Sequence, residues 1–159
     1  MRVVLKHEGG IGFRAKVRGH EFVLDSPAAT SAGIGQDRGP TPKELLLTAI
    51  AGCSAMDVAS ILGKRKVAFD SLEVTCEADT GERHPRVFHE ANLVFDVRGS
   101  DVPLARVIEA VDQSLTLYCG VSANVARTTA IYYTIVLNGE TQFRGQADFS
   151  GKSAAGDQS

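Results

Sequence analysis

The sequence predicts an α+β protein whose strands form antiparallel sheet. Segments with the alternating pattern of strands follow one another through short turns, as they do in hairpins. Two long helical segments separate them, so the expected order is three strands, a helix, two strands, two helices and a strand. The 159 residues, 43% of which are hydrophobic, suit one domain or one subunit of a compact oligomer.

Three short strands are predicted at the start of the chain, over residues 2–7, 11–18 and 21–24. In the middle strand, apolar residues alternate with basic residues or glycine, which is typical of a half-buried strand. Residues 25–39 are rich in serine, alanine, glycine, aspartate and proline, so we expect a loop there.

A long helix is predicted from Pro42 to about residue 64. Thr41 can cap its first turn, Pro42 suits the first helical position, and Glu44 completes a capping box. The helix is apolar nearly all round, so we expect it to be buried in the middle of the structure.

The second half of the chain continues the same mixture of strands and helices. Residues 72–78 and 87–97 alternate in character around a short turn and predict a hairpin. A second helix begins at Pro103, with apolar residues at helical spacing up to Tyr118. A short segment and a final strand over residues 130–137 follow. We therefore expect one domain over residues 1–138 and a disordered tail over residues 139–159.

Composition and charge exclude several classes of function. The net charge of -2 and the lack of a basic stripe argue against nucleic-acid binding. We find no apolar run of the length that a membrane span needs and no signal-peptide region at the start, so we expect a cytoplasmic protein. The four histidines lack ligand spacing and the three cysteines form no CxxC pair, so we expect no metal and no other cofactor.

Two of the three cysteines are candidates for chemistry. Cys53 lies on the long helix and shares a face with Asp57, a carboxylate that is costly to bury without a partner. Cys119 ends the second helix, where Gly120 is expected to stop the helix and permit movement. Cys76 lies on the apolar face of a strand whose apolar residues alternate with polar and charged residues, which is the pattern of a packing residue. For any single cysteine, a role as a small buried hydrophobe is the alternative.

The stretch GPTPKELLLTAIAGCSAMDVASIL and the later YCGVSANV resemble the OsmC/Ohr family of thiol-dependent hydroperoxide reductases. The resemblance covers about residues 2–138 and reproduces the predicted order of elements. The step from Cys53 to Asp57, the segment HPRVFHEANLVFDVRG and the pair Tyr118–Cys119 most resemble the YhfA-like branch of this family.

The resemblance implies an OsmC-like fold, an intertwined homodimer in which antiparallel sheets wrap around two long central helices. It implies that Cys53 is the peroxidatic thiolate, which attacks a hydroperoxide and becomes a sulfenic acid. Cys119 would resolve the sulfenic acid as an intramolecular disulfide, and an external dithiol would reduce the pair. Such a thiolate needs a nearby cation or hydrogen-bond donor, because an ordinary thiol has a pKa of about 8.5.

The chain departs from the family at two supporting positions. Family members use an arginine just after a Gly-Gly pair and a glutamate ten residues before the first cysteine. Here Ile11 follows the glycine pair, and Lys43 occupies the second position. Arg38 and Lys43 are the available substitutes, and Asp57 could anchor a cation or a water. The departures favour an alternative function, that of a dimeric small-molecule-binding or redox-responsive protein without efficient peroxidase turnover.

Overall fold

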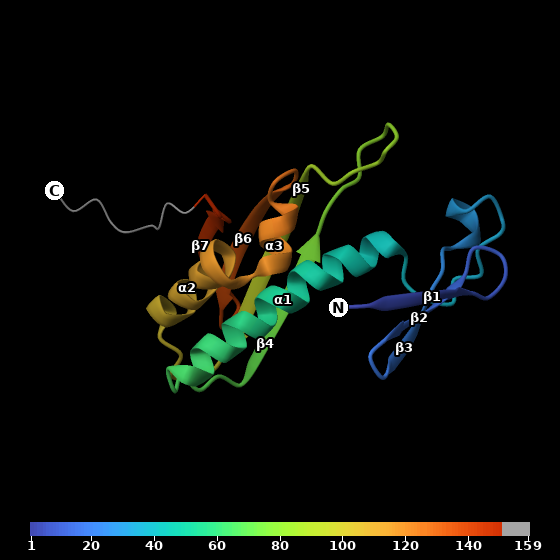
Figure 1. Ribbon diagram of the computed structural model, residues 1–159. Helices are drawn as coiled ribbons and strands as arrows, with labels where there is room; N and C mark the ends of the chain where they lie inside the picture. The colour runs from blue at the N-terminus through green and yellow to red at the C-terminus, as the bar shows by residue number, and fades with distance from the viewer. Residues whose placement is uncertain (151–159) are drawn as a thin grey trace. The chain divides into compact units, whose positions relative to one another are not determined.

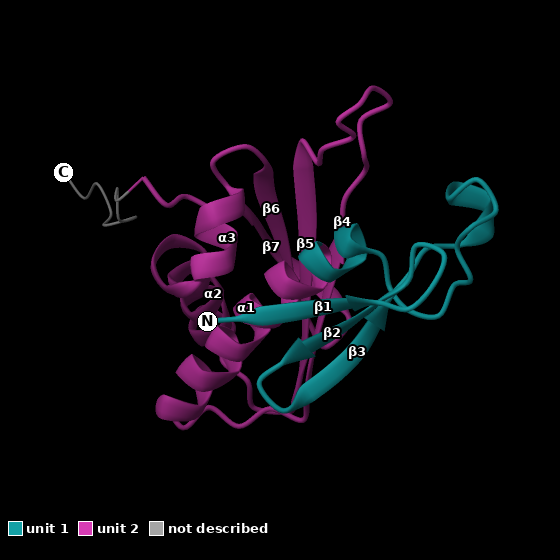
Figure 2. Cartoon of the chain, turned by 45° about the vertical axis from the view of Figure 1, so that its right-hand side comes forward, with its two compact units in different colours: residues 1–46 teal, residues 47–159 magenta. Residues whose placement is uncertain are grey.

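The computed structural model describes residues 1–150. The chain divides into two compact units, residues 1–46 and 47–159, each with its own sheet (Figure 2). The mixture of two sheets and helices confirms the predicted α+β class. Residues 151–159, the end of the predicted tail, lie outside the described residues.

The first unit is a three-stranded antiparallel sheet (Figure 1). Its strands are β1 (Val3–His7), β2 (Phe13–Val17) and β3 (His20–Leu24), in that order. All three predicted strands are confirmed. The predicted loop after them contains one short 3-10 helix, η1 (Ala28–Thr30).

Helix α1 (Pro42–Lys64) begins where the sequence predicts. The backbone N–H of Glu44 donates to Thr41 Oγ1 (3.3 Å), and the N–H of Thr41 donates to the Glu44 carboxylate (2.7 Å). These two bonds form the expected capping box. Burial differs from the prediction, because only one face is buried within the chain and Met56 is 75% exposed. The buried residues are Ile50, Ser54, Val58, Ile61 and Leu62.

Helix α1 also corrects the expectation that the chain has no membrane-length apolar run. It is long and apolar enough to cross a membrane, with a mean hydropathy of 1.9. The core helix of a soluble protein has the same properties, and the buried face of α1 packs in one hydrophobic core with the strands of the second unit. The length and hydropathy of α1 are therefore weak evidence for a membrane span.

The second unit has a four-stranded sheet in the order β4 (Ser71–Glu77), β5 (Glu90–Arg98), β6 (Ala130–Leu137) and β7 (Glu140–Gln146). Strands β4 and β5 are antiparallel, which confirms the predicted hairpin. Strands β5 and β6 are parallel, so the prediction of purely antiparallel sheet is wrong for this pair. Parallel neighbours need a long crossover, and the helices between them supply it.

Strand β7 was predicted to belong to a disordered tail, and that prediction is wrong for residues 140–146. It pairs antiparallel with β6, and Leu137 lies opposite Glu140. The two residues between them, Asn138 and Gly139, both have positive φ (53° and 86°). A two-residue turn with positive φ at both positions matches the twist of a hairpin and favours Asn-Gly.

The crossover consists of α2 (Leu104–Gln113), a π-helical turn η2 (Ser114–Tyr118) and α3 (Gly120–Val125). Together with α1, these helices cover one face of the sheet (Figure 1). Helices and strands share one core, in which Phe95 and Leu115 are fully buried. Gly120 begins α3 instead of stopping the preceding helix, which corrects that prediction.

Candidate functional site

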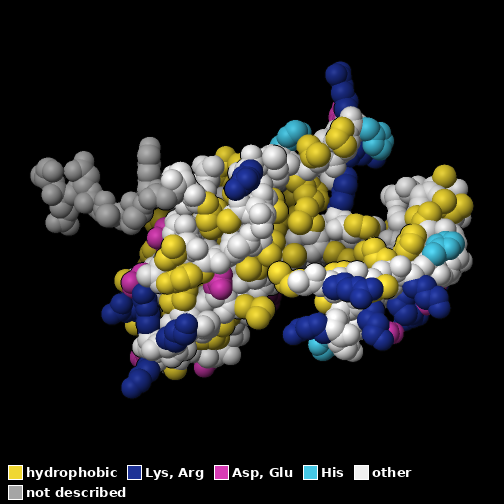
Figure 3. Space-filling model, in the orientation of Figure 1, with side chains coloured by type: hydrophobic (Ala, Val, Ile, Leu, Met, Phe, Trp, Pro, Cys, Tyr) yellow, Lys and Arg dark blue, Asp and Glu magenta, His cyan; other side chains and the backbone are white. Residues whose placement is uncertain are grey.

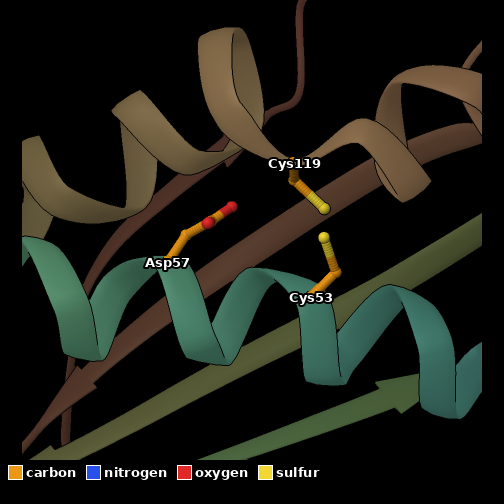
Figure 4. Close-up of side chains that lie close together, drawn as sticks. All are labelled: Cys53, Asp57 and Cys119. Carbon is orange, nitrogen blue, oxygen red and sulfur yellow. The ribbon is translucent and has the colours of Figure 1, made fainter. Parts of the chain in front are cut away.

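Cys53, Asp57 and Cys119 converge where α1 passes the junction between η2 and α3 (Figure 4). The two sulfur atoms are 3.1 Å apart. Both sulfurs and a carboxylate oxygen of Asp57 lie within 4.8 Å of one another. All three cysteines of the chain are free thiols. The fold thus brings together three residues that the sequence singled out separately.

Local structure explains how each of the three side chains is aimed. Cys53 and Asp57 are four residues apart on α1, so they lie one helical turn apart on the same face. Cys119 follows the π-helical turn, and its backbone N–H donates to the carbonyl of Ser114 (2.8 Å). Its side chain then caps α3, because the sulfur accepts from the backbone N–H of Ser122 (3.3 Å).

Three serine hydroxyls surround the cluster, and no motif in the sequence pointed to them. Ser54 Oγ donates to the Cys119 sulfur (3.4 Å), and Ser122 Oγ lies 3.0 Å from the same sulfur. Ser114 Oγ donates to the Asp57 carboxylate (3.1 Å). All three serines are fully buried. Their signal in the sequence is weak: each is a small polar residue within an otherwise apolar helical face.

The two thiols differ in acidity because their surroundings differ. Burial raises the pKa of Cys53, and its hydrogen bond to Cys119 and the negative charge of Asp57 raise it further. A hydrogen bond with the Val121 backbone lowers it but does not offset these effects. Burial also raises the pKa of Cys119, but hydrogen bonds from Ser122, Ser54 and Cys53 outweigh it, so the pKa of Cys119 is lowered overall. The surroundings therefore favour the thiolate of Cys119 and the protonated thiol of Cys53.

Cys53, the thiol with the raised pKa, is the more accessible of the two. Cys119 is completely buried, whereas Cys53 and Asp57 are only half-buried. A surface cavity of about 330 Å³ reaches Asp57 and is also lined by Ser60, Arg65 and Tyr118. The cavity thus opens at the Asp57 end of the cluster, and of the two sulfurs only Cys53 belongs to a side chain that is partly accessible.

The two predicted cations belong to the first unit. Arg38 Nε donates to the carboxylate of Asp25 (2.9 Å), which is buried, and its guanidinium lies directly against Gly12. The ion pair holds the pKa of Asp25 at about 2, well below its usual value. Lys43 is exposed in the first turn of α1, about 15 Å along the helix axis from Cys53.

The third cysteine lies apart from this cluster. Cys76 is on β4, where its side chain packs against the hydrophobic core together with Leu72 and Val74. Burial raises the pKa of Cys76 to about 11. This placement confirms the predicted packing position.

Comparison with known proteins identifies the family and the fold of the chain. Residues 35–134 match the model of the OsmC-like protein family. Protein YhfA of Escherichia coli is 34% identical over 135 residues, which are 84% of this chain and 96% of YhfA. A solved protein of Aquifex aeolicus is 26% identical, with a TM-score of 0.75 over 86% of this chain and 94% of its own.

The fold is also shared with more distant proteins. A solved organic hydroperoxide resistance protein of Elizabethkingia anophelis is 17% identical, with a TM-score of 0.65 over 87% of this chain and 97% of its own. The family match covers both segments of the chain that supply the cysteine cluster, because it extends from before α1 to beyond α3. The chain belongs to the OsmC-like protein family.

Proposed function

We propose that this protein reduces hydroperoxides, organic or inorganic, through the thiols of Cys53 and Cys119. The observation that carries the proposal is the 3.1 Å separation of two sulfurs from distant parts of the chain. Cys53 is half-buried and Cys119 is completely buried, which suits a reacting thiol and a resolving thiol. The relation to organic hydroperoxide resistance proteins supports the same chemistry.

The reaction has two steps in which atoms and electrons balance. The Cys53 thiolate attacks the terminal oxygen of ROOH, the O–O bond breaks, and the products are the Cys53 sulfenic acid and ROH after protonation of the leaving alkoxide. The Cys119 thiol then attacks the sulfenic sulfur, which forms the disulfide and releases water. An external dithiol supplies two electrons and two protons to restore both thiols.

The hydrogen bond between the thiols suggests how Cys53 becomes a thiolate. Hydrogen bonds from Ser54 and the backbone N–H of Ser122 favour a negative charge on the Cys119 sulfur. The Cys53 thiol donates to that charge. Transfer of this proton to Cys119 as Cys53 attacks leaves Cys119 as the thiol that the second step needs.

Arg38 is our candidate for the cation that supports the anionic steps. Family members place an arginine just after a Gly-Gly pair, and here the Arg38 guanidinium lies against Gly12, two residues after the Gly9–Gly10 pair. The side chain comes from a different part of the sequence but delivers the same group to the same hairpin. We propose a cytoplasmic homodimer as the working form, with an external dithiol as reductant.

Peptide mass spectrometry after one equivalent of an organic hydroperoxide tests the proposal. We expect a Cys53–Cys119 disulfide in the unsubstituted chain. In Cys119→Ser, one equivalent should leave Cys53 as the sulfenic acid, and an excess of hydroperoxide should over-oxidise it to sulfinic acid. Cys53→Ser should abolish peroxide consumption, while Cys76→Ser serves as the matched control and should consume peroxide normally. An unoxidised Cys53 beside oxidised Cys76 would reject the assignment.

The raised pKa of Cys53 favours a second candidate function. A thiol that is protonated at neutral pH reacts slowly, so the pair could instead respond to oxidants or bind a small molecule without efficient turnover. The rate of Cys53 oxidation separates the two functions. Multiple turnovers with a dithiol reductant support the peroxidase, and a single slow oxidation supports the alternative.

A further inference from the structure

We propose that Cys53, Asp57 and Cys119 form a binding site for Zn²⁺ with two thiolate ligands and one carboxylate ligand. The spacing of the cysteines along the chain predicted no metal site, but the fold brings the three ligand atoms within 4.8 Å of one another. This inference goes beyond the proposed peroxide chemistry, because it needs only the two reduced thiols and no oxidant.

The ligand set and its dimensions fit zinc. Zinc bonds to thiolate sulfur at about 2.3 Å and to carboxylate oxygen at about 2.0–2.2 Å, usually in tetrahedral geometry. A tetrahedral zinc would separate the two sulfurs by about 3.8 Å, so they need to move apart by less than 1 Å from their 3.1 Å separation. Three protein ligands leave the fourth position for water, as in zinc sites that keep an open coordination position.

The surroundings supply the supporting bonds that metal ligands require. Ser114 Oγ donates to one oxygen of Asp57, which orients the carboxylate and leaves the other oxygen for the metal. Ser54 Oγ and the backbone N–H of Ser122 donate to the Cys119 sulfur, which offsets the negative charge of a thiolate. These groups are buried and already in place.

The site has an entry path from solvent. The cavity of about 330 Å³ is lined by Asp57, so a hydrated ion from solvent can meet the carboxylate ligand first. On binding, Zn²⁺ displaces one proton from each thiol and gives a neutral dithiolate complex, to which the Asp57 carboxylate adds one negative charge. Two sulfur ligands select zinc and similar thiophilic metals over Mg²⁺ and Ca²⁺, which prefer oxygen.

Direct titration of the reduced full-length chain with Zn²⁺, in competition with a chromogenic chelator and without peroxide, tests the proposal. We expect one zinc per chain, with no competition from a large excess of Mg²⁺. Cys53→Ser and Cys119→Ser should each weaken zinc affinity by at least about 100-fold, and Asp57→Asn by about 10-fold. The matched control Cys76→Ser should bind zinc as tightly as the unsubstituted chain.

Cobalt gives a readout that does not depend on how the variants fold. Co²⁺ bound to the unsubstituted chain should show sulfur-to-metal charge-transfer bands with the intensity of two thiolates and the visible bands of a tetrahedral site. Zinc should also protect Cys53 from alkylation at least tenfold. Zinc binding that is absent, or that is equally strong in the Cys53→Ser chain, would overturn the proposal and leave the peroxide test unaffected.

Discussion

Asp57 places a negative charge one helical turn from Cys53, and this charge contributes to the raised pKa of that thiol. In Asp57→Asn the pKa of Cys53 should therefore fall, and its reaction with hydroperoxide at neutral pH should become roughly two- to tenfold faster. Thiolate absorbance as a function of pH and the oxidation rate measure the two effects. Glu73→Gln, on the exposed face of β4, is the control. A slower oxidation of Cys53 in the Asp57→Asn chain would mean that the carboxylate assists the reaction.

Cys76 should be dispensable, because its side chain packs against the core and takes no part in the cysteine cluster. Its pKa of about 11 leaves almost no thiolate at neutral pH. Thiol titration of the native protein should find it slow to react, and Cys76→Ala should cost about 1–2 kcal/mol in unfolding free energy. Loss of turnover in Cys76→Ala with retention in Cys53→Ser would reverse our assignment of roles.

The ion pair between Asp25 and Arg38 should make the first unit sensitive to acid. The pKa of Asp25 is lowered from 3.8 to about 2 in the folded chain. A lowered folded-state pKa adds stability that is fully present above about pH 4 and is lost as the pH falls towards 2. Arg38→Gln should therefore lower the melting temperature at pH 7 and differ little from the unsubstituted chain near pH 2.

Thermal unfolding followed by circular dichroism over this pH range measures that loss. Arg18→Gln, an exposed arginine in the turn between β2 and β3, is the matched control and should leave the profile unchanged. A difference between Arg38→Gln and the unsubstituted chain that stays constant with pH would show that the ion pair is not the cause.

At the scale of elements, strand β7 should be part of the stable fold. Its pairing with β6 covers one edge of the sheet, and Phe143 stacks on Tyr133 with ring centroids 6.0 Å apart. A chain that ends at residue 138 should lose several kcal/mol of stability, because β6 becomes an unpaired edge. A chain that ends at residue 150 keeps β7 and should unfold like the full-length protein. Equal denaturant midpoints for the two truncated chains would contradict this prediction.

Elements with local signals were predictable from the sequence. The capping box fixes the start of α1, and the alternating pattern gives β2, β4 and β5. Strand β7 lacked such a signal, because six of its seven residues are exposed and it does not alternate. The Asn138–Gly139 pair could have indicated its hairpin. The parallel pairing of β5 with β6 depends on how the crossover helices pack, which no local pattern encodes.

The site was predictable only where its residues lie on the same element. Helical periodicity places Asp57 beside Cys53, because both lie on one helix. The pairing with Cys119 came only from the family resemblance, since it depends on the packing of α1 against the junction of η2 and α3. The bonds of Ser54 and Ser122 to the Cys119 sulfur arise from the same packing. They lower the pKa of Cys119, and the sequence pattern does not contain that information.

At the scale of the whole molecule, the distribution of apolar side chains predicts that the chain works as an obligate homodimer. Within residues 1–46, Ala15 is the only hydrophobic residue that is buried. Large apolar residues are exposed on β1 and along α1, and Figure 3 shows hydrophobic side chains gathered on the surface over α1. An exposed apolar surface of this kind marks an interaction site, and self-association is the commonest way to cover it. The exposed residues include Val3, Leu5, Leu46 and Met56.

Sedimentation equilibrium at micromolar concentration should therefore show a dimer without folded monomer. Met56→Lys places a charge on a side chain that is 75% exposed in the isolated chain, and it should weaken association by at least about tenfold because that charge would be buried in the dimer. Glu73→Lys, on the exposed face of β4, tests whether added positive charge alone has this effect and should leave the dimer intact. A folded, peroxide-active monomer of the unsubstituted chain would show that one copy buries enough apolar surface to be stable.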